Sequence, residues 1–309
     1  MEKKPLNLDI DNFFCVSLAY NPITETTPKV FEIENKGKKE KFTEDILANK
    51  LGGIFGNLVM IKTCQRVELY FHSGSNVETI SSEFISLYSK YFDDEIKTVL
   101  DVYSSKKALT HLISLCSGLK SFIIGEKEIY QQVIKLFYYY QTNKYTSDKL
   151  DTIFDYCISI ASKIRKDILD DSKIASYSEL LKQFLTDKGL IPSKIIILGK
   201  GLLSQSISES LNATGIPNEV REDSNLEKIT NGDLFVNCSS KVVINEKVVL
   251  KNNRMIDFSM PPVFEEVSYK FLEYHSLKDF KDHIQENNNK VNELSKMANK
   301  YIDECLSLV

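Results

Sequence analysis

The stretch SKIIILGKGLLS, residues 193–204, decides the fold of the C-terminal half of this chain. Its apolar run suits a parallel strand that is buried on both faces. The Gly-x-Gly turn and the helical pattern after it open a dinucleotide-binding βαβ unit. Gly199 would make the turn, and Gly201 would let the backbone approach a pyrophosphate at the helix N-terminus. Ser204 replaces the third glycine of the pattern but is small enough for close packing of helix on strand. We therefore predict a Rossmann-type NAD(P)-binding domain.

The segment EVRED, residues 219–223, leaves the phosphate preference of this cofactor open. An acidic residue there would hold a ribose hydroxyl, whereas Arg221 could hold a 2′-phosphate. A surface turn of mixed charge explains each of these residues equally well. The residues expected to contact the cofactor are Gly199, Lys200, Gly201, Leu202, Leu203, Ser204 and Arg221.

The N-terminal half alternates between strand and helix periods, which predicts a mixed α/β domain with helices covering one face of a small sheet. Strands are predicted at 13–19, 56–61, 67–71 and 99–103. Helices are predicted at 42–50, 77–91 and 105–116, in a run ending at 140, and at 147–169 and 177–186.

The rest of the chain completes an α/β protein of more than one domain. Two later strands, at 233–238 and 254–258, follow the glycine-rich turn, and residues 278–308 have the pattern of one long helix. We divide the chain into three parts: an N-terminal domain (1–148), a linker helix with the Rossmann-type NAD(P)-binding domain (149–268) and a long C-terminal helix (269–309).

The bulk composition is that of a globular protein. Of 309 residues, 42% are hydrophobic and 27% charged, and neither a transmembrane run nor an apolar signal-peptide core is visible. The six cysteines lie far apart without a CxxC pair, which favours reduced thiols in a cytoplasmic protein over disulfides or a metal site. The net charge of −4 argues against a general nucleic-acid binder.

A second motif, KTCQRVELY at residues 62–70, places Cys64 in a turn between two predicted strands. The guanidinium of Arg66 can lower the pKa of a nearby thiol and bind a carboxylate through paired hydrogen bonds. We therefore predict a chemical centre at this turn. The alternative is that Cys64 is a small apolar side chain packed behind the sheet.

A third motif, SGLKSFIIGE at residues 117–126, leads into a helix. Gly118 and Gly125 bracket a tight loop, and Glu126 stands where a helix N-terminus favours negative charge. The aromatic run FYYY at 137–140 could stack on bases. We expect it instead to pack against the next helix, because four adjacent residues spread around the whole helix circumference.

Taken together, these motifs resemble the glutamyl-tRNA reductase family over most of the chain. Residues 63–66 (TCQR) are similar to the Thr-Cys-Asn-Arg turn of that family. The residues His111-Leu112, the loop 117–126 and Gln132 are similar to its His-Leu, Ser-Gly-Leu-Asp-Ser, Gly-Glu and Gln positions. Comparable residues also occur at 163–166, in the Gly-Lys-Gly turn and at Ile256-Asp257.

The chain departs from the family pattern at several positions. Gln65 replaces an asparagine, Lys120 an aspartate, and Lys127-Glu128 a Pro-Gln pair. Residues 20–24 barely resemble the His-Lys-Thr-Ala-Pro stretch of the family, and its Asn-Arg-Thr after the second strand of the cofactor domain is missing. The sequence stops at Val309, so we expect the dimerisation bundle of the family to be absent and leave a homodimer open.

The resemblance implies that the substrate is glutamate esterified to tRNA(Glu). Cys64 would form a thioester with the glutamyl group, which NADPH would reduce to glutamate-1-semialdehyde, opening tetrapyrrole synthesis. His111 would act as general acid/base; without the resemblance it would be a hydrogen-bonded histidine on an apolar helix. Glutamate-1-semialdehyde aminomutase is an expected partner. The substrate-binding residues would be Thr63, Arg66, Ser121, Glu126 and Gln132.

Two other functions stay open at this point. A non-catalytic paralogue that binds tRNA or a haem-pathway enzyme would explain the altered cofactor turn and Lys120. A nicotinamide dehydrogenase acting on a small thioester or aldehyde would need no RNA.

Overall fold

The computed structural model describes residues 8–19, 52–53, 55–63, 65–89, 100–169, 176–221, 234–239, 250–260 and 262–309. The chain forms two compact units, one of residues 1–174 with 291–309 and one of residues 175–290. Each unit is described by itself. Among the described residues, no helix is long and apolar enough to cross a membrane. The predicted helix at 42–50 and the segment 20–24 lie outside the described residues.

The first unit contains a four-stranded antiparallel sheet in the order β2-β3-β1-β4. Its strands are β1 (Phe13–Ala19), β2 (Leu58–Lys62), β3 (Arg66–His72) and β4 (Leu100–Ser104). The register places Ser17 of β1 opposite Glu68 of β3. Cross-strand partners share a face of the sheet, so this pairing sets one of the contacts of the site.

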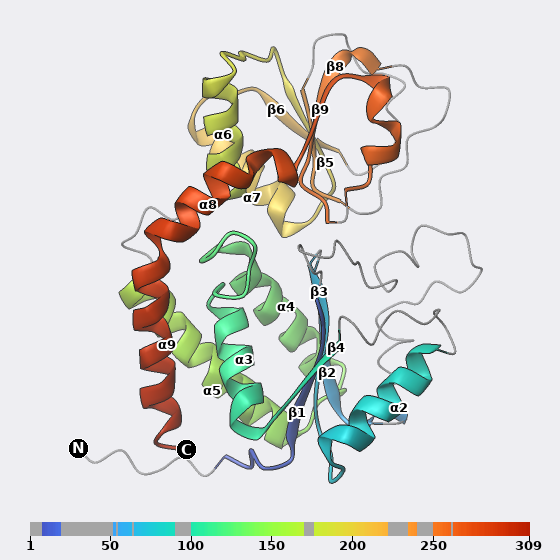
Figure 1. The fold of residues 1–309 in the computed structure, drawn as a ribbon, viewed down its shortest axis with the longest axis vertical. Coiled ribbons are helices and arrows are strands. Elements are labelled where there is room, and N and C mark those ends of the chain that lie inside the picture. Colours follow the sequence, from blue (N-terminus) through green and yellow to red (C-terminus); the bar gives the residue numbers. More distant parts are fainter. Residues whose placement is uncertain are drawn as a thin grey trace. The chain divides into compact units, whose positions relative to one another are not determined.

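Helices cover both faces of this sheet. The helices are α2 (Val77–Ser89), α3 (Ser105–Cys116), α4 (Glu128–Thr142), α5 (Asp148–Ile164) with the π turn η3 (Arg165–Leu169), and α9 (Asn292–Leu306). In Figure 1, α3, α4 and α5 lie on one side of the strands and α2 on the other. The prediction that helices cover one face was wrong, because the apolar residues of β1 alternate onto both faces and all but its last residue are buried.

The second unit contains a five-stranded parallel sheet in the order β6-β5-β7-β8-β9. Its strands are β5 (Ile195–Leu198), β6 (Asn218–Arg221), β7 (Leu234–Asn237), β8 (Leu250–Asp257) and β9 (Phe271–Ser276). The apolar run of β5 is buried throughout, as predicted for a central parallel strand. The chain order reverses between β5 and β7, and ligands of such sheets bind at the carboxyl ends of the strands at this switch point.

The helical elements of the second unit are α6 (Tyr177–Asp187), α7 (Leu202–Ala213), α8 (Lys281–Lys290) and the 3-10 turns η5 (Glu265–Lys270) and η6 (Leu277–Phe280). The helix α7 follows the Gly-x-Gly turn directly, as the sequence motif predicts.

The prediction of one continuous helix at 278–308 was wrong, because the structure has two helices there, α8 and α9. The helical run is interrupted at Val291, where ψ is 1°, after an asparagine-rich stretch that favours helix poorly. The two parts serve different cores: Ile284 of α8 is buried in the second unit, whereas Ala298 and Ile302 of α9 are buried in the first. The first unit also takes α5, which packs against α3, so the compact units differ from the three predicted parts.

Candidate functional site

The turn between β2 and β3 is closed by local hydrogen bonds. The backbone N–H of Thr63 donates to the carbonyl of Arg66 at 2.9 Å, and the N–H of Gln65 donates to Oγ1 of Thr63 at 3.2 Å. The side chain of Gln65 reaches out of the turn, because its Oε1 accepts the N–H of Phe122 at 3.2 Å. The motif at 63–66 is therefore tied to the loop 117–126. Cys64 itself lies outside the described residues.

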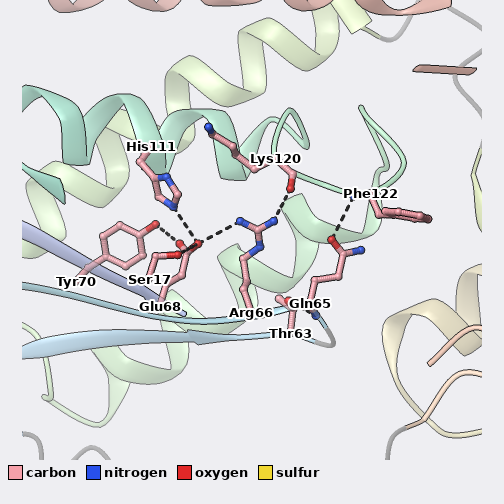
Figure 2. A network of polar contacts seen from close by, with 9 residues as sticks. All are labelled: Ser17, Thr63, Gln65, Arg66, Glu68, Tyr70, His111, Lys120 and Phe122. Atoms are coloured by element: carbon pink, nitrogen blue, oxygen red, sulfur yellow. Dashed lines mark hydrogen bonds and ion pairs between the residues drawn. The ribbon is translucent and has the colours of Figure 1, made fainter. Parts of the chain in front are cut away.

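Arg66 is buried at the start of β3, with both ends of its guanidinium engaged (Figure 2). Nη1 donates to Oε1 of Glu68 at 3.2 Å, and Nη2 donates to the backbone carbonyl of Lys120. The side chain of Lys120 is exposed. Its contact with Arg66 goes through the main chain, so it does not depend on the charge of the residue at 120.

Glu68 is the centre of a polar network that the sequence did not predict (Figure 2). Its carboxylate is fully buried on β3, where the side chains of Arg66, Glu68 and Tyr70 follow the period of two that places residues on one face of a strand. Oε1 accepts from the hydroxyl of Ser17 at 3.1 Å and from Arg66, while Oε2 accepts from the hydroxyl of Tyr70. Nε2 of His111 lies 2.9 Å from Oε1.

These contacts keep Glu68 ionised. Burial by itself would raise the pKa of this carboxyl, but His111, Arg66 and Tyr70 outweigh burial through their charges and hydrogen bonds and lower the pKa to about 2. An ionised carboxylate can only accept hydrogen bonds. Nε2 of His111 is therefore the protonated ring nitrogen at neutral pH, and Nδ1 is the nitrogen with a lone pair when the imidazole is neutral.

His111 lies on the buried face of α3 and is fixed from a second direction. Its ring stacks on Tyr103, with 4.3 Å between ring centroids and 21° between planes. The carboxylate contact and the stacking together determine the orientation of the imidazole, a common way to hold a catalytic histidine.

The loop 117–126 folds back on itself through its two glycines. Gly118 has φ +82°, and a Cβ there would lie 2.8 Å from the carbonyl oxygen of Glu126, so only glycine fits. Arg165 of η3 holds the loop by donating to three of its carbonyls, those of Ser117 at 3.1 Å, Glu126 at 2.9 Å and Gly125 at 3.4 Å. This arginine lies within the segment 163–166, which resembles the family, but its contacts with the loop were not predicted.

Ser121 and Glu126 meet inside this loop, through a hydrogen bond of the Ser121 side chain to the Glu126 carboxyl. Burial, reinforced by the charge of Glu128, raises the pKa of Glu126 to about 8, although Ser121, Arg66 and Arg165 oppose the shift. Glu126 is therefore mostly protonated at neutral pH. Among the described residues its Oε2 is buried without a hydrogen-bond partner, so this carboxyl can donate to or accept from a bound group. Gln132 lies half-buried on α4.

Three potential metal ligands approach one another in the same region. Donor atoms of Cys15, Glu68 and His111 lie within 4.8 Å of each other. Oε1 of Glu68 already takes three donors, one of which is the guanidinium of Arg66, and burial raises the pKa of the Cys15 thiol well above its usual value. The contacts are those of a hydrogen-bond network rather than those of a cation site.

The second unit has a tight glycine-rich turn at the end of β5, where the sequence predicts a dinucleotide site. Gly199 has φ +112°, and a Cβ there would lie 3.0 Å from Cβ of Ser239 and 3.2 Å from Oγ of Ser204. Gly201 is the N-cap of α7, and a Cβ there would meet nothing within 4 Å. The hydroxyl of Ser204 is buried and has no hydrogen-bond partner in the part of the chain that the structure describes. A tight turn, open backbone at a helix N-terminus and an unused buried hydroxyl fit a pyrophosphate group.

The two residues considered for ribose recognition bind each other. Arg221 ends β6 and donates to both carboxylate oxygens of Glu219, at 2.9 and 3.2 Å. Lys194 also contacts this carboxylate. Hydrogen bonds from Arg221 and Lys194 lower the pKa of Glu219 to about 2. Of the other predicted cofactor residues, Lys200 is exposed and Leu202 and Leu203 are half-buried.

Comparison with known proteins finds a family match for most of the first unit. Residues 24–168 match the model of the glutamyl-tRNA(Glu) reductase N-terminal domain, which covers the turn at 63–66, His111 and the loop 117–126. Residues 24–168 thus belong to the family of glutamyl-tRNA reductase N-terminal domains.

Curated relatives carry the same family name. The chain is 27% identical to the glutamyl-tRNA reductase of Vesicomyosocius okutanii over 206 residues, which are 63% of this chain and 49% of that protein. It is 28% identical to that of Wigglesworthia glossinidia brevipalpis over 289 residues, 79% of this chain and 67% of that protein. The chain thus spans from about half to two thirds of the length of these relatives. The solved glutamyl-tRNA reductase of Methanopyrus kandleri shares the fold, with a TM-score of 0.53 and 17% identity over 96% of this chain and 79% of that chain.

The departures from the glutamyl-tRNA reductase pattern have a structural explanation at three positions. Gln65 makes a contact with Phe122 that spans the gap between the turn and the loop. Lys120 contributes its carbonyl rather than its side chain. Glu128, where the family has glutamine, is buried in the first turn of α4 and supplies the charge that helps to raise the pKa of Glu126.

Proposed function

We propose that this protein reduces glutamyl-tRNA(Glu) to glutamate-1-semialdehyde with NADPH, by way of a thioester on Cys64. The observation that carries the proposal is the buried network of Arg66, Glu68 and His111, which begins two residues after Cys64. A guanidinium and an oriented imidazole are what a nucleophilic thiol and an acidic substrate need beside them. The match of residues 24–168 to the glutamyl-tRNA reductase N-terminal domain and the similarity to curated glutamyl-tRNA reductases support the same reaction.

In the first step the thiolate of Cys64 attacks the ester carbonyl of the glutamyl group. A carbon–sulfur bond forms, the ester bond to the 3′-terminal ribose of the tRNA breaks, and the ribose oxygen leaves with a proton. The fixed cation of Arg66 favours the thiolate. The arrangement of His111, with Nε2 held by Glu68, leaves Nδ1 to exchange the proton with the reacting groups.

The glutamyl group would be held by side chains from the turn and the loop. Arg66 would attract its carboxylate, and Ser121 and the protonated Glu126 would hydrogen-bond its polar atoms. Thr63 and Gln132 complete the proposed substrate set. Because Oε2 of Glu126 has no partner within the described ranges, a bound substrate would satisfy a buried group that otherwise carries a desolvation cost.

A reduced nicotinamide dinucleotide would supply the hydride that converts the thioester to the aldehyde and frees the thiolate. Its pyrophosphate would lie against the turn and the first residues of α7, and Arg221 would contact the 2′-phosphate of NADPH by giving up hydrogen bonds to Glu219. The residues proposed to hold it are Gly199, Lys200, Gly201, Leu202, Leu203, Ser204 and Arg221. The aldehyde product would enter tetrapyrrole synthesis through glutamate-1-semialdehyde aminomutase.

Incubation with charged glutamyl-tRNA, with and without NADPH, tests this function. The proposal predicts semialdehyde with NADPH, slow deacylation of the tRNA without it, and loss of both in Cys64→Ser. A gel shift without turnover would instead indicate a binding protein. Reduction of small thioesters with no effect of tRNA would indicate a general dehydrogenase.

A further inference from the structure

The carboxyl edge of the parallel sheet carries a buried polar pair in its middle. Asn237 ends β7 and Asp257 ends β8, and the two residues are partners in the parallel register. Both have no exposed surface. Burial of a polar side chain costs free energy unless its polar atoms are hydrogen-bonded. The hydrogen bonds of this pair therefore indicate which parts of the backbone it holds in place.

The carboxylate of Asp257 is saturated with donors on both oxygens. Oδ1 takes one donor from β7 and two from Ser259 just after β8, whereas Oδ2 takes donors from residues 263–264 of the following loop and from β9. Oδ1 accepts from Nδ2 of Asn237 at 2.8 Å and from the N–H (3.0 Å) and hydroxyl (2.5 Å) of Ser259. Oδ2 accepts from the N–H groups of Val263 (2.9 Å) and Phe264 (3.0 Å) and from the hydroxyl of Tyr274 (3.2 Å).

The side-chain amide of Asn237 connects Asp257 to Ser239, which lies against the glycine-rich turn. While Nδ2 donates to Asp257, it also donates to the carbonyl of Ser239 at 3.0 Å, and Oδ1 accepts the N–H of Ser239 at 3.2 Å. The backbone of Ser239 is thus held by both ends of one amide. Cβ of Ser239 is also the atom nearest to a Cβ built at Gly199, at 3.0 Å.

We propose that Asp257 is a positioning residue for the dinucleotide site: through Asn237 it fixes Ser239 against Gly199 at the switch point of the sheet. This inference rests on the proposed use of a dinucleotide. Asp257 itself touches no cofactor atom in this account. It orients the side-chain amide of Asn237, and that amide holds the backbone of Ser239 beside Gly199.

Replacement of Asp257 by asparagine should break this chain of contacts without a change of side-chain size. Every partner of the carboxylate is a donor, and an amide offers one oxygen and one NH₂ group. In either orientation the NH₂ group meets donors, so Asp257→Asn must displace Asn237 or the 263–264 backbone. Asn237→Ser shortens the bridging amide directly and tests the same link if Asp257→Asn does not fold.

The test is the NADPH dissociation constant, measured by isothermal titration calorimetry well below the melting temperature of each variant. Asp257→Asn and Asn237→Ser should each weaken binding about tenfold, the effect of losing one or two hydrogen bonds. The control is Tyr274→Phe, which removes one donor from the oxygen of Asp257 that faces away from β7, and it should bind within about twofold of the unaltered chain. Deacylation of glutamyl-tRNA without NADPH should be the same in all of them.

Affinity in Asn237→Ser equal to that of the unaltered chain would overturn the inference. So would an equal loss in Tyr274→Phe, because that pattern follows general destabilisation and not the link through Asn237. If the unaltered chain does not bind NADPH at all, the proposed function fails together with this inference, and that result is seen before any variant is made.

Discussion

Replacement of Glu68 by glutamine should destabilise the protein strongly and in a pH-dependent manner. The carboxylate is fully buried and accepts from Ser17, Arg66, His111 and Tyr70. An amide in its place keeps the size of the side chain but removes the negative charge and turns one acceptor into a donor. Arg66 then stays buried without its counter-charge, which is the costly outcome for a buried pair.

The pKa of Glu68 gives the size and the sign of this effect. Its lowering from 4.5 to about 2 corresponds to about 3 kcal/mol of stability at neutral pH. Since the folded-state pKa lies below the unfolded one, this contribution is fully present above about pH 4.5 and is lost as the pH falls toward 2. The variant should therefore be about 3 kcal/mol less stable than the unaltered chain at pH 7, and the difference should shrink between pH 4.5 and pH 3.

Urea unfolding followed by circular dichroism measures the difference, since the chain has no tryptophan. The matched control is Glu83→Gln, which removes an exposed carboxylate from α2 in the same unit and should change stability by less than about 0.5 kcal/mol. A loss in Glu68→Gln that is the same at pH 7 and pH 3, or no larger than in the control, would refute the reasoning, because the carboxylate charge would then not hold the network together.

Three further predictions concern other parts of the molecule. Glu126→Gln should stabilise the protein by about 1–3 kcal/mol at pH 8 and by less at pH 5. The reason is that burial raises the pKa of Glu126 to about 8, so between these pH values the carboxyl loses its proton mainly in the unfolded chain. If urea unfolding shows a stability difference between variant and unaltered chain that does not grow from pH 5 to pH 8, the prediction is wrong. Gly199→Ala should lower the free energy of unfolding by about 1–3 kcal/mol, because φ is +112° and the added Cβ is crowded, whereas Gly201→Ala should leave the melting temperature unchanged. Equal melting temperatures of the two variants would contradict this. Iodoacetamide at neutral pH should label Cys64 first, as read by peptide mass spectrometry, and earlier labelling of a buried thiol would count against an activated Cys64. The thiols whose pKa is raised by full burial are Cys15, Cys116 and Cys157.

Local patterns predicted those elements whose sequence determines their period. The strand at 13–19 and the helix at 105–116 have the predicted bounds, because the first is an apolar run interrupted only by Ser17 and the second has a regular apolar face. The Gly-x-Gly turn also lies between β5 and α7 as predicted. The break at Val291 was missed because a helix that leaves one core and enters another keeps the same apolar spacing on both sides.

The candidate site was only partly visible in the sequence. Arg66 and His111 were selected as separate motifs, but the carboxylate that joins them was read as an ordinary strand residue. Glu68 joins them because β3 pairs with β1 in one register and because α3 packs over that face. Strand register and helix packing are tertiary features, so spacing along the chain could not reveal them. The alternation of Arg66, Glu68 and Tyr70 on one strand face was the available signal.

The most direct test of the central claim is mass spectrometry of the protein after mixing with glutamyl-tRNA in the absence of NADPH. The account predicts one glutamyl group on the peptide that contains Cys64, which disappears when NADPH is added and never forms in Cys64→Ser. The account would be contradicted if excess charged tRNA left this peptide unmodified without NADPH and semialdehyde still formed once NADPH was added.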